Sequence, residues 1–164
     1  MELIVNILVI ATIVAVITLL YSTSYNKLII SKNKATEVWA NIIKEVNIRF
    51  NLLSQLNEVA NQYLDDQTKA SIARVTQSYS TKGAHEDIIN VYYEANQIVD
   101  GVLAKLNNAE WNQAFKDSFD RIETLRKEYN DTILKINNLV KMFPTSLIAK
   151  LNGISPWVFF RGVE

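Results

Sequence analysis

The first twenty residues constrain the fold more than any other part of the chain. Leu3 to Leu20 reads LIVNILVIATIVAVITLL, a run of 18 residues without a charged side chain. As a helix rising about 1.5 Å per residue, this run crosses most of the roughly 30 Å of hydrocarbon in a bilayer. Tyr21 and Tyr25 follow it and suit the membrane–water interface. The run therefore predicts a transmembrane anchor over residues 1–24.

Two other interpretations of this run fit less well. A secretory signal peptide has a basic start and a small-residue cleavage site, whereas here Glu2 opens the chain and Tyr-Ser-Thr-Ser-Tyr follows the run. A helix buried in a soluble protein rarely contains so long an uncharged stretch. Lys27, Lys32 and Lys34 lie on the C-terminal side of the run. The positive-inside rule then predicts a single-pass protein of the cell (inner or plasma) membrane, with its N-terminus outside and its large domain in the cytoplasm.

The rest of the chain predicts an all-α fold. Gly and Pro are absent before Gly83, which favours long helices because both residues are costly inside a helix. Two neighbouring apolar stripes repeat every seven residues, as in a coiled coil that buries one face against a partner helix. The first contains Trp39, Val46, Leu53 and Ala60, and the second contains Leu28, Ala35, Ile42, Leu56 and Tyr63. Together with the anchor, they predict an elongated antiparallel helical bundle or coiled-coil-like domain.

Arg49 falls on the second stripe, where an apolar residue is expected. The simpler interpretation is that its stem packs while its head lies at the surface or against a carboxylate. The alternative is a buried polar residue that fixes register or oligomeric state.

Several breaks divide the predicted helices. Asp65 and Asp66 either cap a new helix or lie on a solvated face, and Ser80–Ala84 is the clearest turn. Asn107 with Glu110 resembles a capping box, and Pro144 is expected to stop the last helix. The apolar positions that follow the turn form two further stripes: Ile88, Tyr92, Ala95, Val99, Val102 and Leu106, then Phe115, Ile122, Tyr129, Ile136 and Phe143.

The C-terminal tail, residues 144–164, is aromatic and contains Trp157, Phe159, Phe160 and Arg161. It fits either a core plug or an anchor on the membrane surface. In an antiparallel bundle, an even number of helices after the span would return the tail to the bilayer. A first helix unbroken to Ser78 would give three helices and leave the tail far from the bilayer.

Residues at both ends of the helical region resemble the bacterial LemA family. The first block contains Tyr25, Asn26, Leu28, Ile29, Asn33, Ala35, Trp39, Ile42, Arg49, Leu52 and Leu53, and the second contains Arg126, Tyr129, Asn130, Ile133, Asn137, Phe143, Pro144, Ile148, Ala149 and Gly153. Ile48, Asn51, Ser54 and Gln55 depart from the family's pattern, and residues 65–120 match it weakly. The resemblance implies a LemA-like helical domain over 25–143 behind an N-terminal anchor. It also implies no established enzymatic activity and a role in membrane organisation. Its structural or interaction candidates are Tyr25, Asn26, Trp39, Arg49, Tyr129, Asn130, Phe143 and Pro144.

Composition excludes several functional classes. Seventeen basic residues balance seventeen acidic ones, which argues against nucleic-acid binding, and cysteine is absent. His85 is the only histidine and has no second ligand at helical spacing, so we expect it to lie on a solvated turn. No glycine-rich phosphate loop or nucleophile elbow occurs. We therefore expect no enzymatic activity, metal or cofactor.

Two functions remain open from the sequence. One is a membrane-anchored scaffold that forms a homo-oligomer through its apolar stripes and organises the bilayer or recruits partners. The other is a monomeric, membrane-tethered adaptor whose helical domain binds one protein partner.

Overall fold

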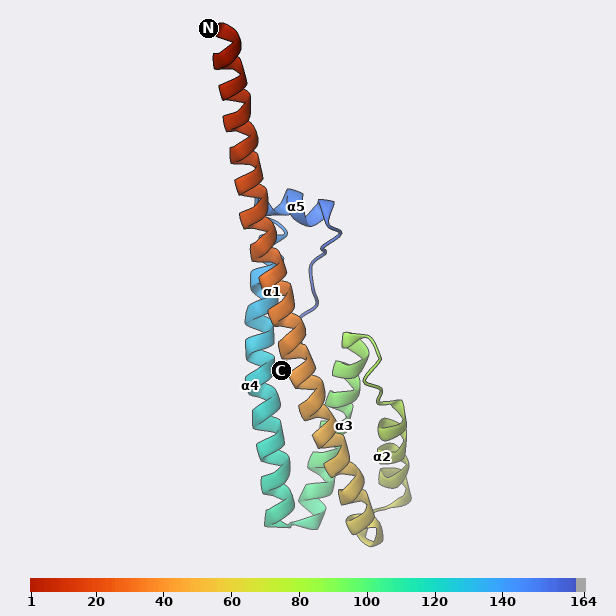
Figure 1. Ribbon diagram of the computed structural model, residues 1–164. Helices are drawn as coiled ribbons and strands as arrows, with labels where there is room; N and C mark the ends of the chain where they lie inside the picture. Colours follow the sequence, from red (N-terminus) through yellow and green to blue (C-terminus); the bar gives the residue numbers. More distant parts are fainter. Residues whose placement is uncertain (162–164) are drawn as a thin grey trace. The chain divides into compact units, whose positions relative to one another are not determined.

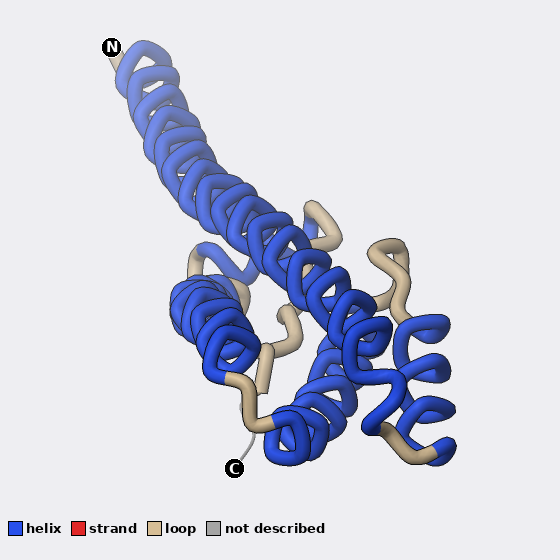
Figure 2. Tube along the Cα trace, turned by 90° about the horizontal axis from the view of Figure 1, so that it is seen from below, coloured by secondary structure: helices blue, strands red, loops and turns tan. Residues whose placement is uncertain are grey.

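The computed structural model describes residues 1–161, and every regular element within that range is helical (Figure 2). Within these residues, five α-helices follow one another, with one 3₁₀ turn, η1 (Asn61–Tyr63). The α-helices are α1 (Glu2–Ala60), α2 (Asp66–Ser78), α3 (His85–Leu106), α4 (Ala109–Leu139) and α5 (Thr145–Leu151) (Figure 1). The predicted all-α class is confirmed.

The chain divides into two compact units, and both α1 and α4 contribute to each. The first unit comprises Met1–Glu37 with Asp131–Trp157, and the second comprises Val38–Asn130 with Val158–Glu164. Residues 162–164 of the predicted tail lie outside the described residues. By length and composition, α1 is the one helix in the described range able to cross a membrane, and its apolar N-terminal stretch is exposed throughout.

In the second unit, α1 and α4 run antiparallel. Trp39 of α1 contacts Tyr129 of α4, while Glu45, six residues later on α1, forms an ion pair with Arg121, eight residues earlier on α4. Contacts that advance on one helix and retreat on the other require opposite directions. The helix α2 packs on α3, and the stacked rings of Tyr79 and Phe50 join the end of α2 to α1 at 4.0 Å.

The two stripes predicted on the first helix become buried core. From Leu28 to Ala60, the apolar stripe positions are 0–9% exposed, while Tyr63 is 63% exposed. Tyr63 leaves the stripe because α1 ends at Ala60 and the backbone changes to a 3₁₀ turn, which breaks the seven-residue phase. The stripe of α3 is buried as far as Val102, and Leu106, the last residue of that helix, is half-buried.

The helix boundaries follow local capping. The Asp65 carboxylate accepts a hydrogen bond from the Thr68 N–H at 2.8 Å, so the capping interpretation of this residue is confirmed. Between α3 and α4, the cap is Asn108 and not the predicted Asn107. The Asn108 side chain accepts from the N–H of Glu110, while Asn107 ends α3 in a left-handed conformation with φ 45°. The predicted cap was one residue too early, because Asn107 ends α3 and the adjacent Asn108 caps α4.

The end of the last long helix differs from the prediction. The helix α4 stops at Leu139, five residues before Pro144, and Pro144 precedes the short helix α5. The prediction that Pro144 stops the last long helix is wrong. A proline is compatible with the start of a helix, where no N–H is needed, and Pro144 stands at the start of α5. Phe143 therefore lies beyond the α4 stripe and is 82% exposed.

Candidate functional site

Arg49 is buried in the second unit and links three helices. Its side chain extends from α1, and its Nε donates to Asn96 Oδ1 of α3 at 2.6 Å. Its Nη1 donates to the Phe115 carbonyl of α4 at 2.8 Å. The guanidinium also lies over the Phe115 ring, 5.1 Å from its centroid, in cation–π geometry. The expectation of a surface or carboxylate-bound head is wrong, because neutral groups of two other helices hold it inside.

Burial of Arg49 has an electrostatic cost. Loss of water lowers the pKa of the guanidinium, whereas Tyr92 and the charge of Asp100 oppose this shift. The bonds to Asn96 and Phe115 replace part of the lost hydration. Arg49 is thus a buried polar residue, as the second interpretation has it, and its hydrogen bonds join α1 to α3 and α4.

A cavity of about 330 Å³ opens beside this guanidinium. It lies between α3 and α4 and is lined by Arg49, Asn96, Asp100, Leu103, Asn112, Phe115, Lys116 and Phe119. Both charge signs occur in this lining. The space is large enough for water molecules beside the buried guanidinium.

A cluster of aromatic side chains surrounds Trp39 in the same unit. The His85 ring stacks on the indole with a centroid distance of 3.8 Å, and the Tyr129 and Phe160 rings lie 5.3 Å and 6.3 Å away. The Tyr129 hydroxyl lies 3.2 Å from His85 Nδ1. Burial lowers the pKa of His85 and raises the pKa of Tyr129 to about 12. Both shifts favour the neutral forms of the rings.

His85 is half-buried, so its placement on a solvated turn is wrong. It begins α3, where the chain turns back against α1, and the Trp39 ring covers it. Within residues 1–161, no group of three or more His, Cys, Asp or Glu side chains has the geometry of a metal site.

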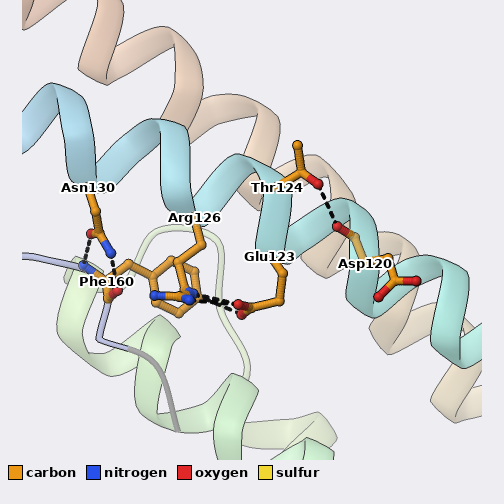
Figure 3. A network of polar contacts seen from close by, with 6 residues as sticks. All are labelled: Asp120, Glu123, Thr124, Arg126, Asn130 and Phe160. Atoms are coloured by element: carbon orange, nitrogen blue, oxygen red, sulfur yellow. Dashed lines mark hydrogen bonds and ion pairs between the residues drawn. The ribbon is translucent and has the colours of Figure 1, made fainter.

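Asn130 holds the C-terminal tail to α4. Its side-chain amide accepts from the Phe160 N–H at 2.9 Å and donates to the Phe160 carbonyl at 2.7 Å (Figure 3). The neighbouring Tyr129 hydroxyl donates to the Val158 carbonyl at 3.3 Å. The Tyr129–Asn130 pair thus binds the backbone of an extended segment. Asn26 of the other Tyr–Asn pair is exposed, and Tyr25 stacks on Tyr21 at 6.0 Å.

In the first unit, Asn137 binds the tail in the same manner. Its amide accepts from the Trp157 N–H at 2.8 Å and donates to the Trp157 carbonyl at 3.0 Å. Asn137 is seven residues after Asn130, and Trp157 is three residues before Phe160. From the sequence, Asn137 was named only as part of the family resemblance. The signal that could have identified it is its place two helical turns after Asn130, on the same face of the helix.

Phe160 is a core residue. Its side chain is 1% exposed, and its ring lies about edge-on to Tyr92 and Tyr93, with centroids 5.8 Å and 5.9 Å away. Of the two interpretations of the tail, Phe160 fits the core plug, and its placement among the membrane-surface residues is wrong, because a ring enclosed by protein cannot contact lipid. Phe159 and Arg161 are exposed, and Trp157 is half-buried.

Comparison with known proteins places these residues in a family. A sequence model of the LemA family matches residues 38–164, well over half of the chain. The match begins after the apolar run and includes the aromatic tail. No curated protein and no solved structure gives a match. Trp39, Arg49, Tyr129 and Asn130, which build the core described above, all lie within the matched range. The chain therefore belongs to the LemA family.

Proposed function

We propose that this protein is a membrane-tethered adaptor without enzymatic activity, which acts as a monomer and binds one protein partner through its helical domain. The observation that carries the proposal is a contrast within α1. Its apolar residues up to Leu20 are exposed, whereas its stripe positions from Leu28 to Ala60 are covered by other parts of the same chain.

The exposed part of α1 supports the tether. Its side chains are about half to three-quarters exposed, for example 72% at Leu3 and 66% at Leu19. A continuous apolar surface of this length is unfavourable in water and favourable in hydrocarbon. The stacked rings of Tyr21 and Tyr25 lie at its end, which suits the interface.

The covered part of α1 favours a monomer over a self-associating scaffold. A scaffold built through coiled-coil seams needs an apolar stripe free to meet another copy. Ile42, Val46 and Leu53 are instead at most 1% exposed within one chain. These stripe positions are therefore already packed against other parts of the same chain.

The proposal that the protein has no enzymatic activity is supported by the contacts of its polar core residues. Arg49 binds Asn96 and the Phe115 carbonyl, and His85 packs on Trp39 next to Tyr129. Groups committed to internal contacts in this way hold helices together and present no free acid–base pair to a substrate.

The test is the size and membrane attachment of the full-length chain. Native mass spectrometry from nanodiscs is expected to release a single chain of 18.7 kDa. Alkaline carbonate is expected to leave the protein in the membrane pellet, and Ile13→Lys to weaken that attachment, because a lysine at the centre of a span costs about 3 kcal/mol.

Each part of this test has its own opposing result. Release of a dimer or larger assembly would reject the monomer and favour the scaffold. Complete extraction of the unaltered chain by carbonate would reject the tether. Lys135→Ala, at an exposed position of α4, is the matched control and should change neither measurement.

A further inference from the structure

A second apolar surface lies in the first unit, on the turn after α4 and on α5. Met142, Phe143, Leu147 and Leu151 are the large apolar side chains exposed there. Phe143 is 82% and Leu151 71% exposed, more than most side chains of the apolar run itself. Leu147 and Leu151 are four residues apart and so share one face of α5. We call Lys141–Leu151 the foot segment.

The opposite face of α5 fixes the foot segment to α1. Ile148 and Ala149 are buried in a small core with Leu28 of α1. Tyr25, Leu139, Val140 and Ile154 pack around this core. The exposed leucines are therefore presented by a helix that is held in place beside Tyr25 and Leu28, within one compact unit.

This position lies close to the end of the apolar run. Leu28 is eight residues beyond Leu20, or about 12 Å along a helix axis. Headgroup layers extend about 5–8 Å beyond the hydrocarbon on each side, and interfacial helices bury their apolar face about 5–10 Å deep. Figure 1 shows α5 lying across the axis of α1, the orientation of a helix parallel to a bilayer that α1 crosses.

The charge of the foot segment also suits a lipid surface. Lys141 and Lys150 are exposed, and no acidic residue occurs from Lys141 to Gly153. Exposed leucines and aromatic rings flanked by lysines are typical of helices that lie in the interface of anionic membranes.

We propose that the foot segment rests on the bilayer surface, with Met142, Phe143, Leu147 and Leu151 among the headgroups and upper acyl chains. Lys141 and Lys150 then face anionic headgroups. This inference rests on the proposed membrane tether and adds a second contact, which holds the first unit at a fixed tilt and rotation on the membrane.

Site-directed spin labelling tests the proposal on the full-length chain. The protein contains no cysteine, so each single-cysteine variant carries one nitroxide. Phe143→Cys, Leu147→Cys and Leu151→Cys are labelled in vesicles of phosphatidylcholine and phosphatidylglycerol. Ile13→Cys reports the inside of the span, and Lys135→Cys reports an exposed polar position of α4 in the same unit. Collisions with oxygen, which concentrates in lipid, are compared with collisions with a water-soluble nickel chelate.

The expected result is an oxygen-to-nickel ratio at the three foot positions that is several-fold higher than at position 135 and lower than at position 13, because the membrane surface is more polar than the centre of the span. If the ratio at the foot positions equals that at position 135 while the ratio at position 13 is that of lipid, the proposed contact of the foot segment is rejected and the membrane tether is supported. Foot labels shielded from both reagents would also overturn it, because they would be covered by protein, either a second copy or a partner. A water-like reading at position 13 would reject the tether, and the foot with it.

Discussion

Arg49 brings a positive charge into the core of the second unit, where its hydrogen-bond partners are neutral. Loss of the guanidinium removes one hydrogen bond from Asn96 Oδ1 and one from the Phe115 carbonyl. Each buried acceptor left unpaired costs about 1–3 kcal/mol, although removal of a desolvated charge offsets part of this cost.

We therefore predict that Arg49→Ala lowers the free energy of unfolding by about 2–5 kcal/mol. Urea unfolding of the full-length chain in detergent, followed by circular dichroism, measures this value. The matched control is Arg121→Ala, which removes an exposed ion pair with Glu45 and should cost at most about 1 kcal/mol. Equal, small losses in the two variants would contradict the structural role of Arg49.

His85 gives the protein a defined acid sensitivity. Its pKa is lowered in the folded state by burial, so the unfolded chain takes up a proton at higher pH than the folded chain does. The contribution of the neutral ring to stability is complete above its unfolded pKa of about 6.5 and declines as pH falls below that value.

We predict that the melting temperature falls as pH is lowered from about 7 to 5, and that His85→Phe removes part of this fall. Phenylalanine keeps a ring against Trp39 but does not titrate, and the chain contains no other histidine. An identical pH dependence in the two proteins would show that the ring of His85 is not protected from protonation in the folded state.

Among the helices, the junction between α3 and α4 depends on two adjacent asparagines with different roles. Asn108 caps α4 through its side chain, whereas Asn107 supplies a left-handed backbone. We predict that Asn108→Ala lowers the free energy of unfolding by about 0.5–2 kcal/mol. Asn107→Gly should leave it unchanged or slightly raised, because glycine adopts positive φ without strain.

Chemical unfolding of the two variants separates these roles. If Asn107→Gly were the more damaging change, the cap would be Asn107, as the capping-box pattern first suggested.

The long helices and their breaks could be read from the sequence because their signals are local. Seven-residue spacing predicted the buried faces of α1, α3 and α4, and turn-forming residues marked Ser80–Ala84. The helix α5 was missed because seven residues following a proline are too few to show a helical period.

The interior site depended on contacts that no local pattern contains. Arg49 meets Asn96 and Phe115 across 47 and 66 residues of sequence. A long cationic side chain on an apolar stripe can place its head in water or in the core, and only the partners decide between these outcomes.

At the scale of the whole molecule, the proposed orientation in the membrane follows from the lysines after the apolar run. We predict that the domain lies in the cytoplasm, so that green fluorescent protein fused after Glu164 fluoresces in bacterial cells and alkaline phosphatase at the same position is inactive. Replacing Lys27, Lys32 and Lys34 with asparagine should reduce this preference. Active phosphatase on the unaltered chain would reverse the orientation.

The burial of Phe160 has a consequence for the order of events during synthesis. Its ring completes a core with Trp39, Tyr92 and Tyr93, all of which precede it by more than 60 residues. During synthesis, the helices that carry these residues leave the ribosome first and have time to form before Phe160 emerges. The core of the second unit therefore closes only after Phe160 has left the ribosome. A premature stop codon at or before position 160 would leave an aromatic cleft open to chaperones and proteases.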